Sequence, residues 1–112
     1  MNGPRCLLGA LLVLGAIPST HADESTGHQV FAKWCAPCHS RGPGNPGTAA
    51  LAAVYRNSKP AALEDRTDMT PAFVKQAVRN GVNVMPFFRK TEISDAELDA
   101  LAAYLARAPK AR

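Results

Sequence analysis

The most regular pattern of apolar and polar positions lies near the carboxyl end of the chain. Its apolar residues recur at i, i+3, i+4 and i+7: Leu98, Leu101, Ala102 and Leu105. This spacing predicts an amphipathic helix. The preceding segment Ser94–Glu97 has the sequence of a capping box, and Ile93 is placed to pack on Leu98 as a hydrophobic staple. Pro109 predicts where this helix ends.

A second segment, residues 70–81, has equally clear helix boundaries. Thr70 is a capping residue, Pro71 suits the first helical position, and Gly81 suits a left-handed residue at the end. Its apolar stripe consists of Phe73, Val74, Ala77 and Val78. We therefore expect a helix between Thr70 and Gly81 that buries one face.

Two more helices are predicted in the first half of the chain. One runs from about Thr26 to Cys35, and a shorter one runs from Ala49 to Tyr55. Between them, the glycines and prolines of Arg41–Gly47 predict a tight turn. Residues 57–68 hold proline, serine and charged side chains and are expected to form a surface connection. Together these patterns predict an all-α fold of three to five short helices.

Composition supports the same fold class. Hydrophobic residues make up 46% of the 112 residues, which is too high a fraction for a disordered chain. Alanine is abundant and valine and isoleucine are few, which favours helices over a β-sandwich or barrel. The formal net charge is +4, from 13 Lys and Arg against 9 Asp and Glu, and the basic residues form no run. A nucleic-acid partner is therefore not indicated.

Residues 1–22 are interpreted as a cleaved secretory signal peptide. Arg5 supplies a positive start, residues 7–17 form an apolar run, and Thr20-His21-Ala22 has the small outer residues of a cleavage site. The run is too short for a transmembrane helix, which needs about 20 residues; an uncleaved anchor is the alternative. We expect residues 23–112 to form one periplasmic domain without a membrane span.

So small and alanine-rich a domain is expected to need a disulfide, a metal or a cofactor in its core. The segment Cys35-Ala36-Pro37-Cys38-His39 has the C-x-x-C-H spacing that attaches c-type haem. On one helical turn, the two thiols can bond the two vinyl groups of one porphyrin, and His39 then projects toward the iron. We therefore expect one covalent haem c, with thioethers from Cys35 and Cys38 and with His39 as an axial ligand.

A thioredoxin-like dithiol oxidoreductase is the rival interpretation, because Trp34–Cys38 resembles such an active site. A thioredoxin fold needs a strand, a helix and a strand before its cysteines, and only residues 23–34 precede Cys35 after cleavage. No sequence pattern of a buried strand lies before or after the two cysteines. The dithiol interpretation also leaves His39 without a role. A structural disulfide would close a very short loop and constrain the chain little.

The second axial ligand is expected from the loop between the last two helices. Met85 lies in the non-helical apolar segment Gly81–Phe88, and Pro86 stiffens that segment. A thioether suits low-valent iron, and Met/His ligation raises the reduction potential. The alternatives are that Met85 is ordinary core filler, or that His28 is the ligand, although His28 lies close before the attachment motif. Met69 is expected to pack in the core.

The arrangement resembles the class I monohaem c-type cytochromes over residues 23–112. The resemblance implies a contact between the first and last helices, made by Gly27, Phe31, Leu101 and Tyr104. It also implies a proline carbonyl that orients the proximal histidine, for which Pro43 and Pro46 are both candidates. Because both axial positions are then filled, such a protein transfers electrons and is not an enzyme on its own.

A narrower resemblance concerns Val78–Gly81, Met85-Pro86 and Phe88. These segments are similar to the cytochrome subunit of p-cresol methylhydroxylase and related alkylphenol-oxidising flavocytochromes. The resemblance implies a flavoprotein that oxidises 4-alkylphenols as electron donor, and a downstream cytochrome, copper protein or oxidase as acceptor. The alternative is a free diffusing cytochrome that carries electrons from a periplasmic alcohol dehydrogenase to a terminal oxidase.

Overall fold

The computed structural model describes residues 20–107, with side chains from Glu24 onward. The elements, in chain order, are α1 (Thr20–Val30), η1 (Phe31–Cys35), α2 (Ala36–His39), α3 (Pro46–Tyr55), η2 (Leu63–Asp65), α4 (Pro71–Asn80) and α5 (Asp95–Leu105). Within residues 20–107 no strand is formed, and the one β-type pairing is an isolated bridge between Val82 and Met85. The predicted all-α class is therefore confirmed.

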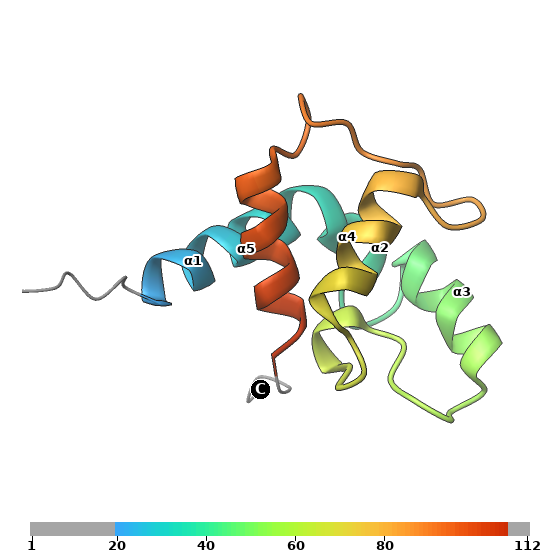
Figure 1. Ribbon diagram of the computed structural model, residues 1–112. Coiled ribbons are helices and arrows are strands. Elements are labelled where there is room, and N and C mark those ends of the chain that lie inside the picture. The colour runs from blue at the N-terminus through green and yellow to red at the C-terminus, as the bar shows by residue number, and fades with distance from the viewer. Residues whose placement is uncertain (1–19, 108–112) are drawn as a thin grey trace, which may run out of the picture.

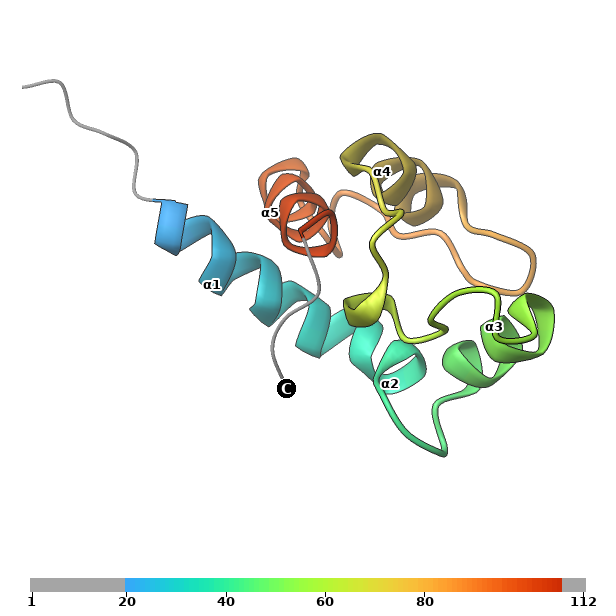
Figure 2. The ribbon, with the colours of Figure 1, turned by 90° about the horizontal axis from the view of Figure 1, so that it is seen from below.

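α1, η1 and α2 follow one another without a break and form a single helical run (Figures 1 and 2). α5 crosses this run, α4 lies beside α5, and α3 lies at the end of the molecule away from the start of α1 (Figure 2). The crossing of α1 and α5 is close: a Cβ at Gly27 would lie 2.3 Å from the carbonyl oxygen of Ala100 and 2.6 Å from Cβ of Tyr104. The expected contact of Gly27 with the last helix is thus present.

The first helix begins earlier than its sequence pattern predicts. It starts at Thr20 rather than near Thr26, because no proline or glycine lies between these positions to end it. Of the interpreted signal peptide, residues 1–19 lie outside the described residues, and residues 20–22 are the first three of α1. Pro109 also lies outside the described residues, and α5 ends at Leu105.

The helix starts of α4 and α5 are as predicted. The Thr70 hydroxyl accepts a hydrogen bond from the backbone N–H of Phe73 at 3.2 Å. Ser94 and Glu97 form a complete capping box, with N···O distances of 2.8 and 3.2 Å. Ile93 and Leu98 are both buried in the core, as a hydrophobic staple requires.

Gly81 differs from its prediction in one angle. It ends α4 with a positive φ of 72°, but its ψ of 172° is extended rather than left-handed helical. The reason is the return of the chain: the backbone N–H of Phe88 donates to the carbonyl of Val78 at 2.8 Å. A Cβ on Gly81 would lie 2.6 Å from the carbonyl oxygen of Met85, so the loop folds directly against this glycine.

The two middle segments are corrected by the structure. α3 starts at Pro46, three residues before the predicted Ala49, because proline suits the first helical turn. Residues 57–68 are not merely a surface connection: they contain η2, and both Ala62 and Arg66 are buried. Periodicity does not reveal this burial, because the segment is too irregular to repeat an apolar face.

The main core lies where α1, η1, α4 and α5 meet. Its buried residues are Val30, Phe31, Cys35, Met69, Val74, Val78, Ile93, Leu98, Leu101, Ala102, Tyr104 and Leu105. α3, in contrast, buries none of its residues. Within residues 20–107, no helix has both the length and the apolar character needed to cross a bilayer.

Candidate functional site

A cavity of about 350 Å³ lies beside this core, and its walls are almost entirely apolar. Five parts of the chain contribute to it: the end of η1 with α2, then α3, the connection before α4, α4 with the following loop, and α5. The lining residues are Trp34, Cys35, Cys38, His39, Leu51, Tyr55, Leu63, Arg66, Met69, Phe73, Val74, Ala77, Val78, Val82, Met85, Pro86, Phe88, Leu101 and Leu105. The same cavity is therefore lined by all four predicted site residues, Cys35, Cys38, His39 and Met85.

The two cysteines reach the cavity from different turns of the helical run. η1 is a wide π-type turn that ends at Cys35, whose side chain is buried, whereas Cys38 on α2 is exposed. Neither cysteine is in a disulfide. Burial raises the pKa of the Cys35 thiol to about 12, and the neighbouring Cys38 adds to this rise. A dithiol oxidoreductase needs a lowered thiol pKa, which the Cys35 thiol does not have, and residues 20–107 form no strand of a thioredoxin fold.

His39 ends α2 with its ring on the cavity wall. Burial lowers the pKa of His39, which favours the neutral imidazole that binds metals. Its Nδ1 is buried and has no hydrogen-bond partner among the described residues. The expected bond to the carbonyl of Pro43 or Pro46 is therefore not formed. Instead, the backbone of Gly47 packs on the ring, where a Cβ would lie only 2.6 Å from Cε1 of His39 and 2.8 Å from Nδ1.

Met85 is held at the cavity by a tight turn in the loop after α4. Val82 and Met85 exchange two backbone hydrogen bonds, of 3.2 and 2.9 Å, and Asn83 between them has a positive φ of 52°. Met85 is half-buried and faces the cavity together with Pro86. Met69 is buried in the core, as expected, and also lines the cavity.

His28, the alternative ligand, is exposed and is absent from the cavity lining. Its ring packs on Tyr104 with a centroid distance of 5.5 Å. The structure therefore does not bring His28 together with the four site residues.

Arg66 is a site residue that sequence reasoning missed. It lines the cavity and is only 6% exposed, although it comes from the irregular connection before α4. Its Nε and Nη2 donate to the Asp68 carboxylate at 2.7 and 2.8 Å, and its Nη1 donates to the Tyr55 hydroxyl at 2.8 Å. No periodic signal marks Arg66, because its partners come from a neighbouring turn and from the end of α3.

These features fit a large, flat, mainly apolar group that carries a metal. The cavity is apolar where such a group needs contact, and two free thiols and a neutral imidazole with an unpaired Nδ1 stand on its wall. A buried arginine adds a cation that suits an acidic substituent. A haem with its propionates has these properties.

Comparisons with known proteins agree with this chemistry. Residues 22–105 match the family model described as cytochrome c oxidase, cbb3-type, subunit III, and the chain therefore belongs to this family of c-type cytochromes. It is also 35% identical over 108 residues to the cytochrome c6 of Picosynechococcus sp. (strain ATCC 27264 / PCC 7002 / PR-6), an alignment that covers 91% of this chain and 92% of that protein. No solved structure gives a significant match.

The family and the cavity together define the kind of molecule. The protein is a monohaem class I c-type cytochrome with one covalently attached haem c. It is an electron-transfer protein rather than a catalytic enzyme.

Proposed function

We propose that this cytochrome transfers single electrons through a haem attached to Cys35 and Cys38 and ligated axially by His39 and Met85. The observation that carries the proposal is that these four side chains, which come from η1, α2 and the loop after α4, line the same apolar cavity. When bound, the haem supplies a one-electron couple that cycles without making a bond to a substrate.

The chain's own residues set the conditions for that couple. With His39 and Met85 both holding its iron, a bound haem would offer no open site for oxygen or peroxide chemistry. The apolar wall excludes water, and a dry site with a thioether ligand favours the reduced state. The buried Arg66 donates to Asp68 and Tyr55 through three of its five N–H groups, and its remaining N–H groups are placed to donate to an acidic haem substituent.

The axial role of Met85 is tested by replacing each of the two cavity methionines in turn. Met85→Leu keeps the volume but removes the thioether, so we expect the sulfur-to-iron charge-transfer band of the oxidised protein to disappear and the reduction potential to fall. Met69→Leu is the matched control, because Met69 lines the same cavity, and we expect it to keep the band. Visible spectra and redox titrations of both variants provide the test. An unchanged band in Met85→Leu, or loss of the band in Met69→Leu alone, contradicts the assignment.

For the partner, we propose a flavoprotein that oxidises 4-alkylphenols and passes its electrons singly to this cytochrome in the periplasm. The support is the similarity of Val78–Gly81, Met85-Pro86 and Phe88 to such cytochrome subunits. The loop that carries Met85 also has an exposed apolar surface suited to docking: Val84 is 97% exposed and Phe87 60%. Phe88, in contrast, turns inward and packs edge-on against Trp34 at 5.8 Å.

A second candidate is a freely diffusing carrier that delivers electrons to a terminal oxidase. Its support is that the description of the matching family model names an oxidase, the class of acceptor that such a carrier would serve. The two candidates are separated by purifying the protein natively at low salt and measuring the ratio of flavin to haem in the visible spectrum. Comparable amounts of flavin and haem support the flavoprotein complex, and haem without flavin supports the carrier.

A further inference from the structure

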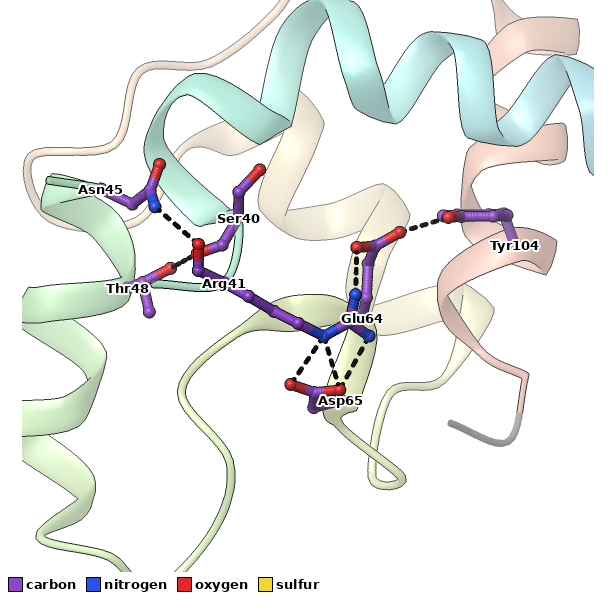
Figure 3. Close-up of polar contacts among 7 residues, drawn as sticks. All are labelled: Ser40, Arg41, Asn45, Thr48, Glu64, Asp65 and Tyr104. Atoms are coloured by element: carbon purple, nitrogen blue, oxygen red, sulfur yellow. Dashed lines mark hydrogen bonds and ion pairs between the residues drawn. The ribbon is translucent and has the colours of Figure 1, made fainter. Parts of the chain in front are cut away.

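A network of charged side chains links the segment after His39 to two distant parts of the chain (Figure 3). Arg41 donates from Nε to both carboxylate oxygens of Asp65, at 2.9 and 3.0 Å, and from Nη2 to Oδ1 at 2.7 Å. Its Nη1 donates to Oε2 of Glu64 at 3.0 Å. The other oxygen of Glu64 accepts a hydrogen bond from the Tyr104 hydroxyl on α5. We call these four residues the clamp.

Residues 40–48, which include the first three residues of α3, are here called the proximal loop. This segment is held together by internal hydrogen bonds. The Thr48 hydroxyl donates to the carbonyl of Ser40 at 2.8 Å. The Asn45 side-chain amide donates to the carbonyl of Arg41 at 3.1 Å (Figure 3) and to the carbonyl of Gly42, also at 3.1 Å. These bonds join the two ends and the middle of the proximal loop. A displacement of the Arg41 side chain therefore displaces the whole loop.

The proximal loop bears directly on His39. The loop begins at the residue after His39, and the backbone of its Gly47 packs on the imidazole ring. The Nδ1 of His39 has no hydrogen bond of its own among the described residues. The ring is therefore held in its orientation by packing against the proximal loop.

The clamp is stronger than an ordinary surface ion pair. Isolated exposed pairs contribute little, but bidentate geometry and membership of a network are the recognised exceptions. The side chains of Glu64 and Asp65 are only 15% and 22% exposed, and that of Arg41 is 37% exposed. Glu64 also bonds to two elements at once, so η2 is fixed between the proximal loop and α5.

We propose that the clamp is a positioning device that fixes the proximal loop, and through it the His39 ring, and holds η2 closed over this side of the cavity. This inference rests on the proposed role of His39 as an axial ligand. Leu63, the first residue of η2, lines the cavity, so release of η2 opens the wall to water. Water stabilises the more highly charged oxidised state, and an opened clamp therefore lowers the reduction potential.

The test is the double variant Arg41→Gln/Asp65→Asn in the haem-loaded protein. It breaks the clamp but leaves the net charge unchanged, so a shift in potential does not come from an altered charge beside the haem. We expect the oxidised-to-reduced ratio at a fixed applied potential to rise several-fold. We also expect the hyperfine-shifted proton signals of His39 in the oxidised protein to move, whereas a purely structural ion pair leaves them in place.

Two further variants keep the test decisive. Tyr104→Phe removes the hydrogen bond from the Tyr104 hydroxyl to Glu64, without a change in charge, and is expected to shift the potential in the same direction by a smaller amount. Lys75→Gln/Asp99→Asn is the matched control, because it removes an exposed ion pair between α4 and α5 whose residues do not line the cavity. We expect this control to keep the wild-type potential.

The outcomes separate this inference from the proposed function. A wild-type potential and unmoved His39 signals in Arg41→Gln/Asp65→Asn overturn the clamp, as does an equal shift in the Lys75/Asp99 control. If the wild-type protein itself shows neither histidine nor methionine signals at the iron, the proposed ligand set fails, whatever the clamp variants do.

Discussion

At the scale of single residues, the site depends on how closely the backbone approaches the His39 ring, as well as on which side chains can bind a metal. Gly47 is the clearest example, because its backbone lies so close to the His39 ring that no side chain fits at this position. The imidazole cannot move away freely, since it follows Cys38 on a four-residue helix and its Nδ1 side is buried. A methyl group at Gly47 therefore acts directly on the ring of His39, the proposed iron ligand.

We expect Gly47→Ala to reduce the yield of haem-loaded protein and to lower its free energy of unfolding by about 1–3 kcal/mol, the usual cost of overpacking. The added Cβ would lie 2.6 Å from Cε1 of His39 and 2.8 Å from the carbonyl oxygen of Cys38. Haem absorbance per protein and urea unfolding provide the measurements. Ala50→Ser, on the exposed side of the same helix, is the control and is expected to behave as wild type. A fully loaded and equally stable Gly47→Ala variant contradicts this role of Gly47.

At the scale of helices, the crossing of α1 and α5 holds the molecule together on one side of the cavity. The two backbones meet at Gly27, and the ring of Tyr104 packs there against both His28 and Phe31, at centroid distances of 5.5 and 5.9 Å. α3 on the other side buries none of its residues. The stability of the helical framework therefore depends on the α1–α5 contact much more than on α3.

Gly27→Ala tests this dependence. Alanine is the better helix former by about 1 kcal/mol, but its Cβ would lie 2.3 Å from the backbone oxygen of Ala100. Neither backbone can yield without separating the helices, so we expect a net loss of about 1–3 kcal/mol in the free energy of unfolding. Gln29→Ala, at an exposed position of α1, is the control for helix propensity. Increased stability of Gly27→Ala would rule out a tight crossing.

The elements that the sequence predicted well are those whose signals are local. Thr70 and the Ser94–Glu97 box bond to backbone groups three residues away, so their pattern in the sequence is sufficient. Arg66 could not be found in this way, because Tyr55 lies eleven residues before it and the burial depends on how the connection folds. The same holds for the clamp, because Tyr104 and Glu64 are hydrogen-bonded although they are forty residues apart in the sequence.

At the scale of the whole molecule, ion pairs within the long connection between α3 and α4 hold that connection in its folded shape. Asp68 is the clearest case: it accepts hydrogen bonds from Arg66 at 2.7 and 2.8 Å and from Lys59 at 2.9 Å. These bonds hold the pKa of Asp68 well below its ordinary value, first through Arg66 and then through Lys59. The carboxylate therefore stabilises the fold only while it is ionised.

This pKa shift gives a direction for the pH dependence. The folded-state pKa of Asp68 is lowered, so its stabilisation is complete above about pH 4, the ordinary value, and is lost as the pH falls below that. We expect Asp68→Asn to be less stable than wild type at neutral pH and to lose less stability on acidification. Urea unfolding between pH 7 and pH 3 measures both effects, with Asp99→Asn as the control. An Asp68→Asn variant with the full acid dependence of wild type would contradict this assignment.

The order of the cavity walls along the chain has a consequence for how the molecule is assembled. Among the described residues that line the cavity, Trp34 alone precedes the two cysteines, and Leu101 and Leu105 come from the last helix. A chain that is synthesised from its amino end thus presents Cys35 and Cys38 before the segments that later enclose them. Haem attachment at these thiols, as proposed above, can then precede closure, and the remaining helices fold onto a surface that is already in place.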